Sequence, residues 1–179
     1  IGMVHQHFKL VQNFTVLENV VLGVETTVGG GVLKMDEARK KVLELSERYN
    51  FHIDPDAKIE DISVGMQQRV EIIKMLYRDN DILIFDEPTA VLTPQEIEEL
   101  LEIMRQLVIE GKSIIFITHK LKEIKEVADT VSVLRKGRYV GTRKVADVSI
   151  EDMSELMVGR KIDLSFDLGQ PKLGKSVLE

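Results

Sequence analysis

The sequence has 179 residues and no cysteine, and its 24 Lys and Arg against 30 Asp and Glu give a formal net charge of −6. A hydrophobic fraction of 44% and a charged fraction of 30% are typical of globular domains and exclude collagen-like, disordered and membrane-spanning chains. The lack of cysteine excludes disulfides and thiolate metal sites, and an acidic balance without a basic stripe argues against nucleic acid as a partner.

Residues 1–80 predict one short strand followed by helices. The apolar stretch 1–6 is consistent with the end of a strand. Thr15 can cap a short helix over the apolar residues 16–21. Met35 starts a second helix, and a third begins near Gly65, each with apolar residues at helical spacing.

The next segment predicts a strand and a long helix. The apolar run 82–85 is typical of a strand that is buried on both faces of a parallel sheet. Thr93 opens a helix with a capping box, because Pro94 and Glu96 follow at the first and third helical positions. That helix is expected to end at Gly111.

Residues 113–157 continue the alternation. They predict a buried strand over 113–118, a short helix over 121–128, strands over 130–134 and 138–142, and a last helix from Ser149 to Met157. Strands that alternate with helices in this way predict an α/β fold with a mostly parallel sheet, into which the earlier helices are inserted.

Two adjacent acids follow the apolar run 82–85, at the edge where open α/β sheets place their ligands. Asp86 could hold Mg²⁺ directly or through water, and Glu87 could polarise a water for attack on a phosphate. The plain alternative is a buried strand that ends in two solvated acids. The apolar run before the pair, with Pro88 and Thr89 behind it, favours the functional interpretation.

Three further patterns are weaker when each is taken alone. Ser63 and Gly65 precede a helix, where a hydroxyl and free N–H groups attract phosphate, although a plain serine-capped helix is common. His119 follows its strand to the same sheet edge as Asp86, where it could contact a terminal phosphate or merely cap the next helix. Gln6 follows the opening strand, and its amide could reach both a metal and a water.

The order of these patterns resembles the ATP-binding cassette (ABC) ATPase family over nearly the whole chain, to about Gly159. The resemblance implies that Gln6 is the Q-loop glutamine, which acts in catalysis and helps Asp86, the Walker B aspartate, to bind Mg²⁺. It also implies that Glu87 is the catalytic base and that His119 is the catalytic switch histidine.

The resemblance likewise identifies a signature motif and a D-loop. The signature motif is residues 63–68, in which the residues implied to bind nucleotide are Ser63, Gly65 and Gln67. Val64 and Met66 depart from the family's general Leu-Ser-Gly-Gly-Gln pattern. The implied D-loop consists of Ala90, Val91, Leu92 and Thr93.

Within the family, the motifs are similar to those of ATP-binding subunits of simple-sugar and nucleoside importers, which carry two cassettes in tandem. The implied fold is a mostly parallel sheet like that of P-loop NTPases, truncated at the N-terminus, with an inserted helical subdomain. Residues 1–13 would be the end of a core strand and the Q-loop, 14–80 the helical subdomain, 81–160 the α/β ATPase core, and 161–179 a linker and the start of a second cassette.

The chain begins with Ile1 and not with Met, so we expect it to be cut from a longer protein. Residues 169–176 fit the phosphate-loop pattern letter for letter, but they lie downstream of Asp86 and only three residues follow them. We therefore expect the chain to lack a working Walker A loop, to bind ATP poorly and not to hydrolyse it alone. We also expect the truncated sheet to leave apolar surface exposed or paired with another copy.

The resemblance implies that the parent protein is the ATP-hydrolysing subunit of an ABC importer for a simple sugar or nucleoside, with ATP and Mg²⁺ as cofactors. It would lie at the cytoplasmic face of the cell membrane with transmembrane permease subunits, a second cassette and, indirectly, a solute-binding protein. One alternative is a soluble ABC ATPase acting on ribosomes or DNA, which the acidic balance disfavours. Another is a degenerate cassette acting as a regulatory or dimerising module, which Glu87 and His119 disfavour.

Overall fold

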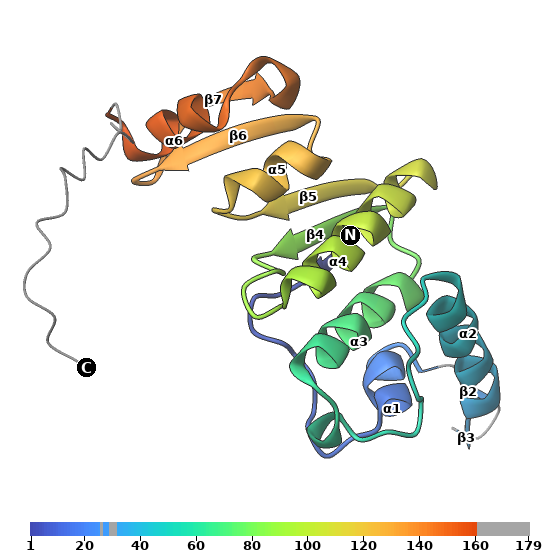
Figure 1. The fold of residues 1–179 in the computed structure, drawn as a ribbon. Coiled ribbons are helices and arrows are strands. Elements are labelled where there is room, and N and C mark those ends of the chain that lie inside the picture. Colours follow the sequence, from blue (N-terminus) through green and yellow to red (C-terminus); the bar gives the residue numbers. More distant parts are fainter. Residues whose placement is uncertain (26, 29–31, 161–179) are drawn as a thin grey trace, which may run out of the picture. The chain divides into compact units, whose positions relative to one another are not determined.

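The structure, a computed structural model, describes residues 1–25, 27–28 and 32–160 (Figure 1). The predicted linker 161–179 lies outside the described residues. The chain divides into two compact units, Ile1–Ala128 and a second unit that begins at Asp129. Each unit is described by itself. No helix in the described part of the chain is both long and apolar enough to cross a membrane.

The first unit contains a three-stranded parallel sheet. Its strands, in spatial order, are β1 (Gly2–Val4), β4 (Ile82–Asp86) and β5 (Ser113–Ile117). Val4 pairs with Phe85, and Phe85 pairs with Phe116 on the other side. The sequence-based prediction of a short opening strand beside a parallel sheet is therefore confirmed.

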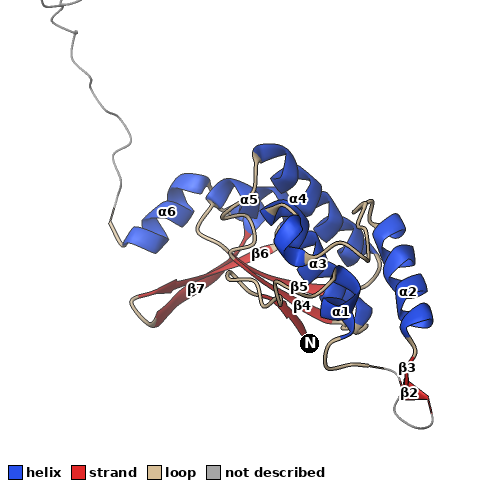
Figure 2. Cartoon of the chain, turned by 90° about the horizontal axis from the view of Figure 1, so that it is seen from below, coloured by secondary structure: helices blue, strands red, loops and turns tan. Residues whose placement is uncertain are grey.

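Helices cover one face of this sheet. The helices of the unit are α1 (Val16–Val21), α2 (Met35–Arg48), α3 (Val64–Tyr77), α4 (Pro94–Ile109) and α5 (Leu121–Val127). Figure 2 shows α1, α3 and α4 on the same side of β4 and β5. Leu83 and Phe85 of β4 point to this side and are fully buried, in one core with Met104 and Leu107 of α4. Burial of these side chains supplies the main driving force for the packing.

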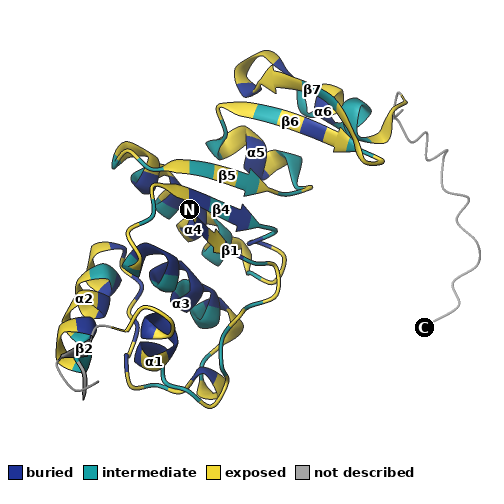
Figure 3. Ribbon diagram, turned by 180° about the vertical axis from the view of Figure 1, so that it is seen from behind, coloured by how far each residue is buried: buried dark blue, intermediate teal, exposed yellow. Residues whose placement is uncertain are grey.

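The opposite face of the sheet is open, which corrects one prediction. Both β4 and β5 were expected to be buried on both faces, yet Ile82 is 37% exposed and no residue of β5 is buried. Ile115 and Ile117 are 51% and 46% exposed, and Figure 3 shows β5 in yellow and teal. The reason is that side chains alternate along a strand, so helices on one side bury only every second residue. Apolar surface is exposed here, as expected.

The helical part of the unit begins at Thr15, which caps α1 as predicted. The side chains of Thr15 and Glu18 each accept from the other's backbone N–H at the start of α1. Two short strands that the sequence did not predict, β2 (Thr27–Val28) and β3 (Val32–Leu33), pair antiparallel before α2. A short 3₁₀ helix, η1 (Ile59–Asp61), then leads into α3.

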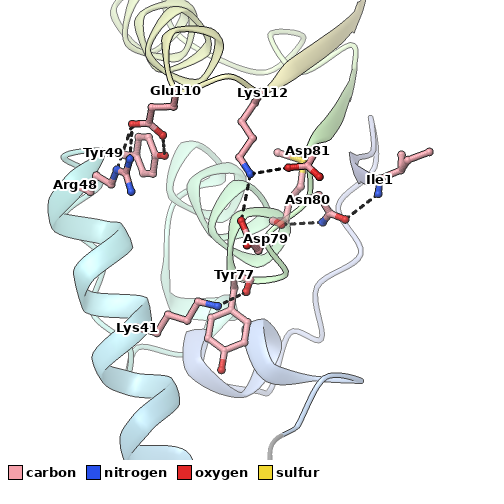
Figure 4. Close-up of polar contacts among 11 residues, drawn as sticks. Ile1, Lys41, Arg48, Tyr49, Tyr77, Asp79, Asn80, Asp81, Glu110 and Lys112 are labelled. Atoms are coloured by element: carbon pink, nitrogen blue, oxygen red, sulfur yellow. Dashed lines mark hydrogen bonds and ion pairs between the residues drawn. The ribbon is translucent and has the colours of Figure 1, made fainter.

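Polar contacts tie α2 and α3 to the end of α4 (Figure 4). The hydroxyl of Tyr49, just after α2, donates to Glu110 Oε2 at 2.6 Å, and Arg48 Nη2 lies 2.9 Å from Glu110 Oε1. Beyond α4, Lys112 Nζ lies 3.2 Å from Asp79 and 3.4 Å from Asp81. These contacts bridge helices that are far apart in the sequence.

The second unit is a hairpin with one helix. Its elements are β6 (Thr130–Arg135), β7 (Arg138–Lys144), the 3₁₀ helix η2 (Val145–Asp147) and α6 (Ile150–Val158), which Ser149 caps as predicted. The prediction that β6 continues the parallel sheet is wrong, because β6 pairs antiparallel with β7 in a separate sheet. Lys136 and Gly137 have φ of 49° and 73°, and two such residues make the tight turn that favours hairpin pairing.

Candidate functional site

The carboxyl ends of three strands lie side by side at one edge of the first unit's sheet. Val4 of β1 pairs with the residue before Asp86, and Asp86 pairs with Ile117 of β5. Gln6 lies two residues after the end of β1, and His119 lies two residues after the end of β5. Both residues are therefore at the same edge of the sheet as Asp86. The expected placement of His119 beside the acidic pair is confirmed.

Glu87 leaves β4 in an uncommon backbone conformation. Its φ is 47°, in the left-handed region that side-chain-bearing residues rarely adopt, and its backbone N–H donates to the carbonyl of Ile117 at 2.9 Å. Such a conformation costs about 1–3 kcal/mol and is concentrated at functional sites. The turn directs the Glu87 side chain toward the segment that follows β5.

Glu87 contacts His119 directly. Nδ1 of His119 lies 2.9 Å from Oε1 of Glu87, and the two side chains are 68% and 18% exposed. An ionised carboxylate only accepts, so Nδ1 carries the donated proton in this pair. Oε2 of Glu87 is buried and has no hydrogen-bond partner among the described residues. Leaving this oxygen unpaired costs free energy, and its lone pairs remain available to accept a proton.

The residues present fit Mg²⁺ only together with a phosphate ligand. Within the described ranges, no group of three or more His, Cys, Asp or Glu could hold a metal ion. Asp86 is half-buried at the end of β4, directly before Glu87 in the sequence. Mg²⁺ is usually held by one or two carboxylates with phosphate oxygens and water, so this donor set suits Mg²⁺ that is also bound to a phosphate group. Gln6 is exposed at the same edge.

A buried polar network behind this edge was not predicted. Thr89 is fully buried, and its hydroxyl donates to Glu123 Oε2 at 2.9 Å. Lys120 Nζ donates to the Thr89 carbonyl at 2.9 Å and lies 3.3 Å from Glu123 Oε1. The network joins the residues just after Glu87 to those just after His119. Nothing in the charged helix α5 marks Glu123 as buried, so pattern alone could not find it.

The predicted signature residues lie at the start of α3. Ser63 caps the helix, and its Oγ accepts from the backbone N–H of Met66 at 3.2 Å. A Cβ at Gly65 would lie 2.0 Å from Oε1 of Glu96 on α4, so any larger residue there would have to displace the Glu96 side chain. Glu96 in turn caps α4, where the N–H of Thr93 donates to it and lowers the pKa of its carboxyl. The close approach at Gly65 is therefore made by α4.

Two neighbouring glutamines on α3 differ in their contacts. Gln67 donates from Nε2 to the carbonyls of Ile59 and Ile62 at 3.2 and 3.3 Å, so its amide holds η1. Gln68 is 2% exposed, and neither polar atom of its amide has a partner among the described residues. It lines a cavity of about 430 Å³ with Tyr49 and other residues of α3 and α4.

The predicted D-loop, Ala90 to Thr93, follows the sheet edge and leads through a turn into α4. The N–H of Ala90 donates to the Glu87 carbonyl at 3.3 Å, and the N–H of Leu92 to the Thr89 carbonyl at 3.5 Å. Val91 is 59% exposed at the tip of the turn. The predicted residues thus form two groups in the structure, one at the sheet edge and one at the start of α3.

Comparison with known proteins identifies the family. The sequence profile described as ABC transporter matches residues 1–90. The chain belongs to the ABC transporter family. Its motif order, and the sheet edge that gathers Asp86, Glu87 and His119, agree with this membership.

Curated relatives are ATP-binding proteins of importers. The chain is 58% identical to the nucleoside import ATP-binding protein NupA of Lactococcus lactis over 96% of its own length and 34% of the relative's. It is 54% identical to the guanosine import ATP-binding protein NupO of Bacillus subtilis over 99% of this chain and 35% of that protein. It is 41% identical to the ribose import ATP-binding protein RbsA of Hahella chejuensis over 93% and 33%. The chain thus spans about a third of the length of these relatives.

A solved structure supports the fold. An ABC transporter in an inward-facing conformation superposes with a TM-score of 0.75 at 16% identity, covering 88% of this chain and 63% of that chain. At this identity the similarity shows the fold alone. The mostly parallel sheet of the P-loop NTPase type, predicted from the sequence, is thereby confirmed.

Proposed function

We propose that this sequence is part of the ATP-hydrolysing subunit of an ABC importer that takes up a simple sugar or a nucleoside. The observation that carries the proposal is the contact between Glu87 and His119 at the end of β4, with a buried carboxylate oxygen left unpaired. The relatives named for nucleoside, guanosine and ribose import support the substrate class.

In the proposed reaction Glu87 acts as the general base. Oε2 of Glu87 accepts a proton from the water that attacks the terminal phosphate of ATP, while the Nδ1 contact of His119 holds the carboxylate in place. Asp86, with Gln6, would hold Mg²⁺, and the ion would neutralise phosphate charge when bound. Ser63, at the positive end of the α3 dipole, would contact the phosphate held by a second cassette, with Gly65 and Gln67 beside it.

The proposed partners follow from this function. They are transmembrane permease subunits, a second ATP-binding cassette and, through the permease, a solute-binding protein. The subunit would be bound at the cytoplasmic face of the membrane. We further propose the domain division given above, in which residues 14–80 form the helical subdomain. We also propose that the 179-residue chain alone neither binds ATP tightly nor hydrolyses it.

The decisive experiment is ATP hydrolysis by the full-length protein with Glu87→Gln. Loss of a positioned general base should lower kcat by a factor of about 100 to 10,000 while ATP still binds. Glu44→Gln is the matched control, because Glu44 is an exposed acid on α2. A wild-type protein without ATPase activity, or an unchanged kcat in Glu87→Gln, would favour a regulatory module and refute the proposal.

A further inference from the structure

The segment after β1 has two parts with different contacts. In the described part of the chain, no hydrogen bond involves Gln6, His7 or Phe8. From Lys9 onward, the backbone accepts or donates hydrogen bonds at Lys9, Val11, Gln12 and Phe14, and none of these bonds is made to a residue of the sheet. The segment is therefore attached to the helical part of the unit and joined to β1 through three unbonded residues.

Glu71 on α3 makes the strongest of these contacts. Its side chain is only 4% exposed, and Oε1 accepts the backbone N–H of Lys9 at 2.6 Å. Lys74, one turn further along α3, donates from Nζ to the Lys9 carbonyl at 2.9 Å and lies 4.0 Å from Glu71. A charge-assisted bond of this length, here partly buried, is stronger than a bond between neutral groups. Both polar groups of the Lys9 backbone are thus bonded to α3.

Asn19 on α1 holds the next part of the segment. It is fully buried, and its amide oxygen accepts the Val11 N–H at 2.7 Å while its amide nitrogen donates to the Val11 carbonyl at 3.0 Å. Backbone bonds from η1 follow, with the N–H of Glu60 donating to the Gln12 carbonyl at 3.1 Å. Hydrogen bonds at Lys9, Val11 and Gln12, made to side chains of α3 and α1 and to the backbone of η1, hold this segment against the helices.

We propose that Glu71 is a positioning residue that fixes the Gln6 loop to the signature helix α3. Lys74 and Asn19 complete the same clamp. The inference rests on the proposed function, in which Gln6 and Ser63 act on nucleotide. Ser63 begins α3 and Glu71 lies eight positions further on, about 12 Å along a rigid helix. A nucleotide that moves the start of α3 therefore moves Lys9 through its two bonds to α3, and this movement changes the position of Gln6 three residues earlier.

Hydrogen exchange in the full-length protein tests the clamp directly. Glu71→Ala should speed exchange of the Lys9 amide roughly 10- to 100-fold, because it removes a bond to a charged group. Glu71→Gln keeps an acceptor oxygen and should restore most of the protection. Glu44→Ala, on the exposed face of α2, is the matched control and should leave the exchange rate of the Lys9 amide unchanged. If the Lys9 amide exchanged at the same rate in Glu71→Ala as in the wild type, the proposal would be overturned.

Lys74→Met is the second variant, for the case in which Glu71→Ala does not fold. The bond from Lys74 Nζ to the Lys9 carbonyl is exposed, so the fold should tolerate its loss. The Lys9 amide should then exchange about two- to fivefold faster than in the wild type. If Lys9 exchange is as slow in Lys74→Met as in the wild type, the clamp is refuted.

Steady-state kinetics of the full-length protein separate positioning from stability. Glu71→Ala should lower kcat for ATP hydrolysis about 10-fold or more with KM unchanged, and Glu71→Gln should recover kcat. Equal kcat in Glu71→Ala and the wild type would refute the role in positioning Gln6. A wild-type protein that hydrolyses no ATP would refute the proposed function instead, and exchange at Lys9 would then decide the clamp by itself.

Discussion

Gln68 and Gln67 offer a paired test of the packing around α3, since they are adjacent and have opposite hydrogen-bond status. Gln68 is buried with an unpaired amide, whereas Gln67 bonds to two carbonyls of η1 and its neighbour. Methionine has nearly the same length and volume as glutamine but no hydrogen-bonding amide. Replacing each by methionine changes the polar contacts and little else.

The two substitutions should change stability in opposite directions. An unpaired buried amide costs about 1–3 kcal/mol, so Gln68→Met should raise the free energy of unfolding by about that amount. Gln67→Met removes the hydrogen-bond donor of the Ile59 and Ile62 carbonyls and should lower the free energy of unfolding by about 1–2 kcal/mol. Because both residues lie on α3, differences in helix propensity largely cancel.

Urea unfolding followed by far-ultraviolet circular dichroism measures both effects. With a slope of about 2 kcal/mol per molar urea, a change of 1 kcal/mol moves the midpoint by about 0.5 M. A higher midpoint for Gln68→Met and a lower one for Gln67→Met would confirm the assignment. If Gln68→Met lowered the midpoint, the Gln68 amide would have a bonded partner in the cavity that it lines, and the reasoning would be wrong.

Two further predictions concern buried polar groups of the first unit. Burial, followed by the bond to Glu110, raises the pKa of Tyr49 to about 12, so its contribution to stability is full below pH of about 10 and is lost as pH rises through about 12. The stability advantage of the wild type over Tyr49→Phe should therefore shrink across that range in urea titrations, and a constant difference would contradict the pKa shift. Thr89→Val should cost about 1.5–3 kcal/mol in the same assay, because Glu123 loses a hydroxyl donor in a buried site, and an unchanged midpoint would contradict the bond.

Local features of the fold were predictable because their contacts span few residues. The capping boxes at Thr15 and Thr93 and the cap at Ser149 join residues three positions apart, so a short sequence pattern contains both partners. The edge that carries Asp86 and His119 was also predictable, since apolar runs mark strands and parallel strands end at the same side of a sheet.

The errors concerned the surroundings of the strands. The apolar runs in β4 and β5 suggested burial on both faces, but hydrophobicity alone does not state how many faces are covered. Whether β6 joined the parallel sheet depended on which strand paired with it, and in the structure that strand is its hairpin partner β7. Both questions concern which surfaces meet, and sequence patterns describe only one surface at a time.

The sequence by itself determined the family, the order of the motifs and the strand ends at which Asp86, Glu87 and His119 lie. Only the tertiary structure decided how they are supported. Lys9 and Glu71 are 62 positions apart, Thr89 and Glu123 are 34 apart, and Gly65 meets Glu96 from another helix. A polar side chain can be buried when a partner forms a hydrogen bond with it, and partners at such separations in the sequence meet only after the chain has folded.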